Sequence, residues 1–410
     1  RYTYIQYSRA NHALQQKLKQ KVKKSMVNLL LAIIYAAFIS LGLPDALLGS
    51  AWPSMYKIMD VPVSYAGVVS MIISCGTVIS SFMSDRVVRK LGTHLVSVIS
   101  VALTALGLFG FSVSGAFWQL CVWAVPYGLG AGSIDAALNN YVALHYSSAH
   151  MNWLHCFWGL GAMAGPYIMG ACLTNGLPFG SGYRTVFYIQ IVLTVVLILS
   201  RPLWKKNDTV ESGEEEKASS VRRVLKMPGA PLTLFAFFLY CALESTTGLW
   251  ASSYLVLQRG TSAETAATMA SLFYIGITAG RFFGGFVSGK LGDRRMVAVG
   301  ITLVLCGTAL LFIPVELCAF IGLIFIGVGC APIYPGLLHQ TPVRFGAQNA
   351  QAIMGMQMAC AYIGSMTMPA LFGKLSDFFG MQLYPTLLLA FAGMLAFAVW
   401  NANRLTIDHR

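Results

Sequence analysis

Charged residues are scarce in this chain of 410 residues. Only 10% of its residues are Asp, Glu, Lys or Arg, whereas 56% are hydrophobic. A typical soluble domain has about 25% charged residues, which it needs to cover its surface. The composition therefore excludes an ordinary soluble protein and leaves no room for a separate soluble domain.

Several chemical signatures are also missing. The sequence has no G-x-x-x-x-G-K-[ST] loop to cradle a nucleotide phosphate, so ATP is not the expected energy source. It has no H-E-x-x-H motif or Cys/His cluster, so we expect no metal and no cofactor. The nine cysteines lie in apolar runs without a C-x-x-C pair, and we interpret them as small core residues. These absences argue against an enzyme.

What the sequence does contain is a series of apolar runs between Met26 and Trp400. A helix of about 20 apolar residues crosses the ~30 Å hydrocarbon core of a bilayer. The pattern predicts an all-α membrane protein with twelve transmembrane helices. The predicted spans are 27–50, 62–84, 93–114, 117–143, 151–174, 184–204, 231–257, 264–289, 296–314, 317–342, 349–373 and 382–402.

The net charge of +13 comes from basic residues in short loops rather than from one helix face. This distribution argues against a nucleic-acid partner and follows the positive-inside rule. All but five of the 28 Lys and Arg residues fall on the side of the N-terminus. We therefore predict a multi-pass protein of the cell membrane with both termini in the cytoplasm. The five exceptions are Lys57, Arg184, Arg259 and Lys374 on the other side, and Arg281 within a span.

The longest polar stretch between spans, at 205–229, separates six spans from six. We predict a six-helix bundle at 26–204, a cytoplasmic linker at 205–229 and a second six-helix bundle at 230–404. Residues 1–25 are basic and amphipathic, and we interpret them as a cytoplasmic surface helix or a segment foreign to the native chain. Residues 405–410 are expected to form a short cytoplasmic tail.

The two halves share three residue patterns, separated by 199, 203 and 204 positions. A repeat of this kind predicts two pseudo-symmetric bundles. The matched patterns are Asp45-x-x-x-Gly49 with Glu244-x-x-x-Gly248, Gly165-Pro166-x-x-x-Gly170 with Pro369-x-x-x-Gly373, and Ser81-x-x-x-Asp85-Arg86-x-x-Arg89-Lys90 with Gly285-x-x-x-Gly289-Lys290-x-Gly292-Asp293-Arg294.

The third pattern places a carboxylate beside basic residues at a helix end. Such groups can pair across two bundles in one conformation and separate in another. We therefore predict a gating latch between the bundles, although the same basic residues also set the topology. The predicted latch consists of Asp85, Arg86, Arg89, Lys90, Lys290 and Arg294.

The loop at 81–90 resembles the signature loop of the major facilitator superfamily, G-x-x-x-D-R-x-G-R-R/K. Ser81 and Val88 stand in place of two of its glycines, and the copy in the second half lacks the acid. The position of this loop between the second and third spans also matches that superfamily. The resemblance implies the major facilitator fold and a transport function.

Residues 132–166 resemble more narrowly the fucose-permease-like and sodium–glucose-facilitator-like sugar transporters. In that group an acid followed four residues later by Asn precedes N-x-x-[QH]-x-F. The acid here is Asp135, where Glu is frequent, and Asn140 stands where proline is common. The resemblance implies proton and substrate roles for the acids of the first and fourth spans, which are Asp45 and Asp135.

Ionisable residues within spans cost about 2.5–3.5 kcal/mol each on insertion scales, so they usually have a function. An apolar surrounding disfavours a charged carboxylate, which lets it bind and release a proton. We predict proton coupling by Asp45, Asp135 and Glu244, with a structural role as the alternative. For Arg281 we favour a side chain that reaches the interface, or a structural ion pair.

Polar and aromatic side chains gather near these acids. Asn139 lies one turn after Asp135, and Asn152 and His155 share a face of the fifth span. Sugar sites combine aromatic walls with a few polar groups. The predicted substrate-binding residues are Asn139, Asn152, His155, Trp158, Gln357 and Tyr362.

These features predict a secondary active transporter that works by alternating access. The favoured mode is symport of a proton and a small neutral solute such as a monosaccharide. The alternatives are a proton-driven efflux antiporter for lipophilic compounds, and a sodium-coupled or uniport sugar carrier. The expected partners are the solute, protons and the lipid bilayer, and a monomer suffices for this architecture.

Overall fold

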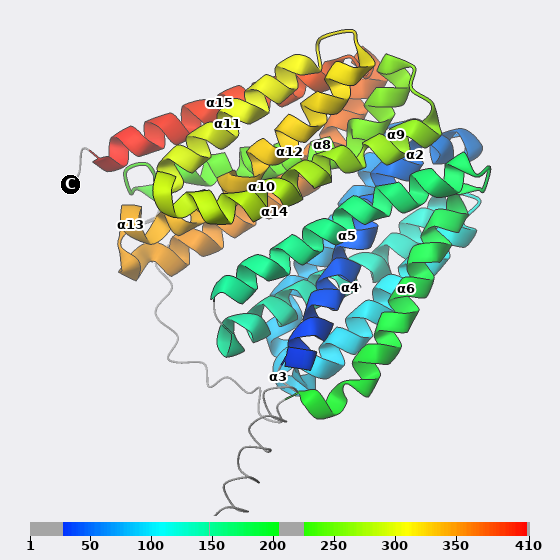
Figure 1. The fold of residues 1–410 in the computed structure, drawn as a ribbon, viewed down its shortest axis with the longest axis horizontal. Helices are drawn as coiled ribbons and strands as arrows, with labels where there is room; N and C mark the ends of the chain where they lie inside the picture. Colours follow the sequence, from blue (N-terminus) through cyan, green and yellow to red (C-terminus); the bar gives the residue numbers. More distant parts are fainter. Residues whose placement is uncertain (1–27, 147, 205–224, 408–410) are drawn as a thin grey trace, which may run out of the picture.

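The computed structural model describes residues 28–146, 148–204 and 225–407, and within these ranges the chain forms helices without strands. Figure 1 shows two bundles, one on each side of residues 205–224. A helical segment at 28–45 opens the first bundle. The remaining helices of that bundle are α2 (Leu47–Ile58), α3 (Tyr65–Val113), α4 (Phe117–His145), α5 (Ser148–Thr174) and α6 (Phe179–Leu199). Those of the second are α8 (Ala230–Arg259), α9 (Ala263–Met269), α10 (Ser271–Leu291), α11 (Asp293–Leu310), α12 (Glu316–His339), α13 (Thr341–Phe345), α14 (Ala347–Phe379) and α15 (Leu383–Ile407).

The predicted all-α organisation with two bundles is confirmed. α3 contains two spans, because Gly92 adopts φ 79° and ψ 153° and breaks the helix. α6 begins five residues before the predicted start at 184, since Pro178 precedes it with a φ of −64° that suits a helix start. Eight helices in the described ranges are long and apolar enough to cross a membrane: 28–58, 65–84, 86–113, 153–174, 179–199, 230–259, 316–345 and 383–406.

The first span bends beside Asp45 because of Pro44. Proline lacks a backbone N–H, so the carbonyl of Ser40, four residues earlier, loses its helical donor. The side chain of Gln190 on α6 supplies a replacement, with Nε2 donating to this carbonyl at 2.7 Å. The hydroxyl of Ser40 donates in turn to Gln190 Oε1 at 2.5 Å. The bend at the first acid is therefore fixed by a buried polar pair.

The backbone repeats between the two bundles. Residues with positive φ, called corners below, lie at the ends of corresponding helices in each half, 200 or 204 positions apart. The loop after the second span aligns at 200 by its backbone, whereas its residue pattern gave 204, so the residue pattern was displaced by four residues, about one helical turn. The corresponding corners are Asp60 (φ 50°) with Gly260 (70°), Gly92 (79°) with Gly292 (72°), and Gly176 (72°) with Gly380 (78°).

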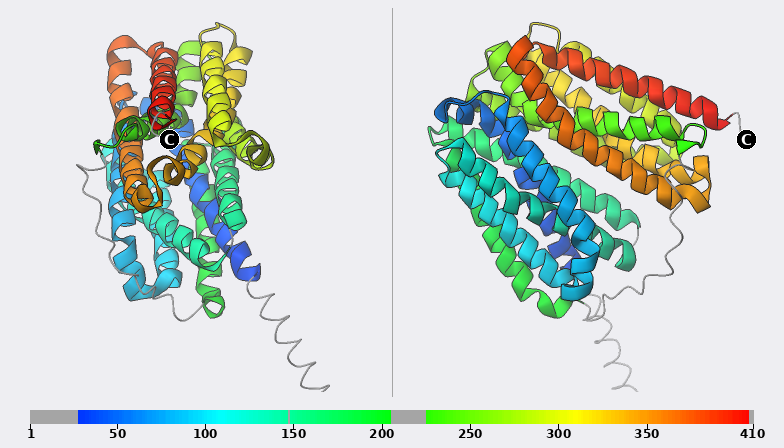
Figure 2. Two further views of the ribbon diagram at one scale, coloured as in Figure 1. Left: turned by 90° about the vertical axis from the view of Figure 1, so that its left-hand side faces the viewer. Right: turned by 180° about the vertical axis from the view of Figure 1, so that it is seen from behind.

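The bundles meet at one end and diverge toward the end where α6 ends and α8 begins (Figures 1 and 2). At the meeting end, called the closed end below, α2 packs on α8 through glycine. A Cβ placed on Gly49 would lie 2.7 Å from the carbonyl oxygens of Gly248 and Leu249. Gly49 and Gly248 are corresponding residues of the repeat, so the backbones touch near the pseudo-symmetry axis.

Two further contacts at the closed end correspond to each other. Gly170 on α5 packs against Thr268 on α9. Gly373 on α14 packs against Ser64 before α3, where an added Cβ would lie 3.0 Å from the Ser64 carbonyl oxygen. The two glycines and the two hydroxyl residues are 203 and 204 positions apart. The closed end is thus built from duplicated contacts that admit no larger residue than glycine.

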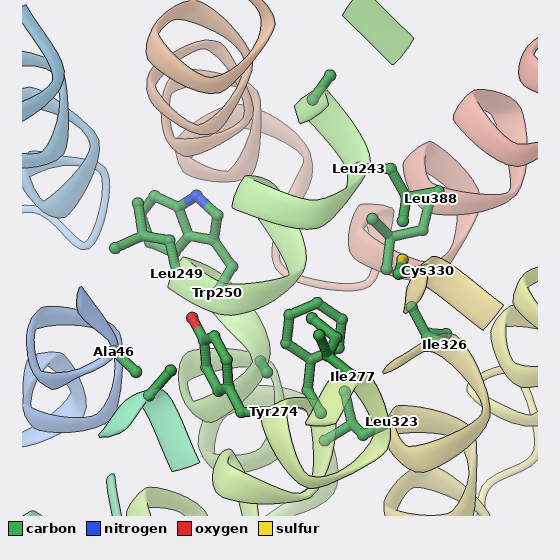
Figure 3. Close-up of a cluster of buried hydrophobic side chains, with 14 of the residues drawn as sticks. Ala46, Leu243, Leu249, Trp250, Tyr274, Ile277, Leu323, Ile326, Cys330 and Leu388 are labelled. Carbon is green, nitrogen blue, oxygen red and sulfur yellow. The ribbon is translucent and has the colours of Figure 1, made fainter. Parts of the chain in front are cut away.

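The core of the second bundle lies directly behind this contact. Figure 3 shows Leu249, Trp250 and Tyr274 packed together, with Ala46 of the first bundle approaching them. Trp250 and Ala46 are almost fully buried, and Trp250 Nε1 donates to the carbonyl of Pro369 at 2.9 Å. The residue after Asp45 is therefore part of the inter-bundle packing.

Candidate functional site

Asp45 is the last residue of the helical segment 28–45, and its side chain is exposed in the middle of the first span. Two donors hold its carboxylate. Trp158 Nε1 on α5 donates to Oδ2 at 2.8 Å, and Tyr127 Oη on α4 donates to Oδ1 at 3.3 Å. Hydrogen bonds to a charged acceptor are stronger than neutral ones, so they support an acid within a span.

The indole of Trp158 also contacts the second bundle. The guanidinium carbon of Arg281 on α10 lies 5.4 Å from the centroid of its ring, within the range of a cation–π interaction. Arg281 Nη2 lies 4.0 Å from Glu244 Oε1 on α8, and the Arg281 side chain is only 19% exposed. Of the two roles expected for this arginine, the structure supports the ion pair, because the guanidinium stays with Glu244.

These contacts form a continuous set across the bundles. Asp45 and Trp158 belong to the first bundle, and Arg281 and Glu244 belong to the second. Among the described residues, this set joins acids from corresponding positions of the repeat through one aromatic ring and one cation. A change of charge at one acid therefore alters the electrostatic environment of the other bundle.

Asp135 and Asn139 pair on α4, as their spacing predicted. Asn139 Nδ2 donates to Asp135 Oδ1 at 2.9 Å and to its carbonyl oxygen at 3.0 Å. The Oδ1 atom of Asn139 is buried and has no hydrogen-bond partner within the described part of the chain. An unfilled acceptor beside an acid suits a ligand that can donate, such as a hydroxyl group.

Tyr362 on α14 faces this pair from the second bundle. Its side chain hydrogen-bonds Ser81 on α3 and lies within electrostatic reach of Asp135. Ser81 is 200 residues before Arg281, and Trp158 is 204 residues before Tyr362, which match the separations of the backbone corners. The Tyr362–Ser81 and Trp158–Arg281 contacts are therefore counterparts on the two sides of the molecule.

The two acids of the first bundle lie at different depths. Tyr127, which holds Asp45, precedes Asp135 by eight residues on α4, which is about 12 Å along a helix. α4 begins at the closed end, so Asp45 lies nearer to that end and Asp135 nearer to the diverging end. This order gives two acidic positions along a path between the bundles.

Two other predicted substrate residues have different environments. His155 is exposed one turn before Trp158, with its ring edge-on to Phe38 at 6.1 Å. Gln357 has no exposed surface, and it exchanges hydrogen bonds with Thr341 at 3.0 and 3.2 Å. The structure brings His155 to the site and leaves Gln357 in the packing of the second bundle, because its amide is already paired there.

The side chains of Asp85 and Asn152 lie outside the described part of the structure, as do residues 1–25. The basic residues of the predicted latch are exposed near the corners at Gly92 and Gly292, on the diverging end. A latch there would require the two bundles to approach at that end, so this part stays a prediction. These exposed residues are Arg86, Arg89, Lys90, Lys290 and Arg294.

Sequence reasoning missed Tyr127 as a site residue and used Ser81 only in the 81–90 pattern, because their contacts with Asp45 and Tyr362 come from other helices. Arg281 carried a signal as a cation within a span, but its contact with Trp158 comes from another bundle. Within the described ranges, no group of three His, Cys, Asp or Glu side chains can hold a metal ion. The site therefore offers carboxylates, one guanidinium, hydroxyls and aromatic rings.

Known proteins, transporters among them, resemble the chain over most of its length. "Bypass of stop codon protein 6" of Saccharomyces cerevisiae is 23% identical over 396 residues, covering 85% of this chain and 77% of the relative. The glucose/mannose transporter GlcP of Bacillus subtilis is 21% identical over 311 residues, covering 73% and 77%. Sodium-dependent glucose transporter 1 of Homo sapiens is 21% identical over 381 residues, covering 84% and 73%.

Solved structures share the fold. The nucleoside transporter NupG matches with a TM-score of 0.74 at 14% identity, covering 91% of this chain and 98% of its own. A bacterial homologue of the human lysosomal transporter Spinster matches with a TM-score of 0.68 at 13% identity, covering 94% and 95%. The sequence profile of the Major Facilitator Superfamily matches residues 34–262 and 232–406. These matches include both bundles.

Proposed function

This chain belongs to the Major Facilitator Superfamily, and we propose that it carries a small neutral solute, such as a monosaccharide, together with a proton. The family and the fold already identify the protein as a multi-pass membrane transporter and not an enzyme. The single observation that carries the proposal is an exposed carboxylate, Asp45, held in mid-span by donors from two helices. An acid placed in this way can exchange a proton with either side as the bundles rock.

The charges at the site favour a neutral solute. Glu244 is paired with Arg281, whereas the side chains that donate hydrogen bonds to Asp45 and Asp135 in the described structure are neutral. An anionic solute would meet two further negative charges, and like charges repel strongly in a low dielectric. A solute with hydroxyl groups can instead donate to Asp135 and to the unfilled Oδ1 of Asn139.

The topology that we propose gives each end of the site a side of the membrane. If the basic end of each bundle is cytoplasmic, the diverging end faces the cytoplasm and the closed end faces outward. Proton entry would then accompany solute entry from the closed end after it opens. Glucose and mannose appear in the name of a relative, which makes hexoses the first solutes to test.

The test measures uptake of radiolabelled sugars into proteoliposomes with either a proton or a sodium gradient imposed. We expect accumulation that requires a proton gradient and fails with Asp135→Asn. Asp377→Asn is the matched control, because Asp377 is an exposed acid at the end of α14. Accumulation driven by sodium, downhill movement alone, or extrusion of lipophilic compounds would each overturn proton symport and identify the corresponding alternative.

A further inference from the structure

The contact between Trp158 and Arg281 carries a proposal about how the two bundles are coupled. We propose that Arg281 is a positioning residue that holds the indole of Trp158, and through it the carboxylate of Asp45, while the closed end is shut. Glu244 is then the fixed counter-charge of Arg281 and not a third proton carrier. This role rests on the proposed transport function and assigns its residues.

The first argument is the geometry of the indole, which makes one contact through its edge and another through its face. Its Nε1 edge donates to Asp45 at 2.8 Å, and its face receives the guanidinium of Arg281 at 5.4 Å. A ring held by both interactions has little freedom to rotate. Because the two partners come from different bundles, separation of the bundles must break the contact with Arg281.

The second argument is the asymmetry between the two corresponding contacts of the bundles, Trp158–Arg281 and Tyr362–Ser81. In the second of these contacts, Tyr362 hydrogen-bonds Ser81, and both side chains are neutral. The repeat therefore places a cation on one side only, where it serves two acids of corresponding origin, Asp45 and Glu244. A purely structural contact would not need a guanidinium, since the neutral Tyr362–Ser81 contact also joins the two bundles.

The third argument concerns Glu244. Its Oε1 atom lies 4.0 Å from Arg281 Nη2, and its side chain is only 21% exposed. Protonation of Glu244 would leave a buried cation without a partner, which is costly. The side chains that donate to Asp45 and Asp135 in the described structure are neutral, so these acids can change charge at a lower cost.

The experiment follows the opening of the closed end without any substrate. Ser64→Cys provides the reporter, because Ser64 is 1% exposed beside Gly373 and its hydroxyl has no partner in the described structure. The purified full chain in detergent is treated with N-ethylmaleimide, and modification at position 64 is measured by peptide mass spectrometry. The native cysteines can then stay in place.

Three variants are compared on this background. Arg281→Gln with Glu244→Gln removes the cation while leaving no buried charge behind. Arg281→Lys keeps the charge of the ion pair and loses the planar group that stacks on the indole. Arg295→Gln makes the same substitution at an exposed arginine of α11 outside the site and is the matched control.

We expect the introduced thiol to react about tenfold faster in the doubly neutral variant, as the loss of a desolvated cation–π contact implies. Arg281→Lys should give a smaller increase in the same direction, and Arg295→Gln should react at the parent rate. In proteoliposomes, the doubly neutral variant should retain exchange of internal for external sugar but lose proton-driven accumulation.

Parent rates of labelling in both arginine variants, with normal accumulation, would show that Arg281 is only a structural partner of Glu244 and would overturn the proposal. Melting temperatures identify any variant that fails to fold, and Arg281→Lys then decides the outcome alone. Because labelling needs neither sugar nor a proton gradient, it remains decisive even if no sugar transport is found. The two proposals therefore fail independently.

Discussion

Gly49 offers a direct way to test how the closed end forms. Replacing it with alanine adds one carbon at the contact of α2 with α8. That carbon would lie 2.7 Å from the carbonyl oxygens of Gly248 and Leu249, closer than the 3.4 Å at which ordinary van der Waals contact begins. Because the opposing atoms belong to the backbone, no side chain can rotate away, and the helices themselves must move apart.

The expected magnitude follows from the packing. An extra carbon in a well-packed contact costs about 1–3 kcal/mol, and only the conformation with a shut closed end bears this cost. A difference of 1–3 kcal/mol shifts a two-state equilibrium by about 5- to 150-fold. We therefore expect Gly49→Ala to favour the conformation in which the closed end is open.

The assay is the reaction of the Ser64→Cys reporter with N-ethylmaleimide. Gly393→Ala on α15 is the control, because a Cβ at Gly393 would have no neighbour within 4 Å. Both changes add the same methyl group to a helix, so the gain in helix propensity cancels. Equal labelling rates for the two variants would refute the proposed closed-end contact.

Two further predictions concern buried amides. Gln190→Met should lower the melting temperature, since it leaves the Ser40 carbonyl without a donor at a cost of about 1–3 kcal/mol; an unchanged melting temperature would contradict the role given to this pair at the bend. Gln357→Leu should likewise act on stability, through the lost bond to Thr341, while the KM for sugar stays the same. A large rise in KM at normal stability would instead support the substrate role predicted from the sequence.

Several site features were accessible from sequence because they depend on one helix. The pairing of Asp135 with Asn139 follows from a spacing of four residues, and the structure has that hydrogen bond. The superfamily that the 81–90 loop indicated is confirmed by the profile match. The echo between Asp45 and Glu244 predicted the repeat, which the backbone corners bear out independently.

Other features depend on contacts between helices. Tyr127 reaches Asp45 from another span, and a single sequence contains no record of that approach. Gln357 has the composition of a binding residue, yet its local partner Thr341 satisfies it inside the second bundle. Packing decides whether such an amide binds a ligand or a neighbouring residue, because any buried amide needs a hydrogen-bond partner.

The sequence by itself determined that this chain lies in a membrane, that its two halves are duplicated and which acids lie within its apolar runs. These follow from local hydropathy and residue order, because a span must satisfy its backbone hydrogen bonds within its own helix. Only the tertiary structure decided which acid faces which donor, that Trp158 joins Asp45 to Arg281, and that glycines close one end. Those outcomes depend on distances between helices far apart in the chain, and helix packing sets these distances.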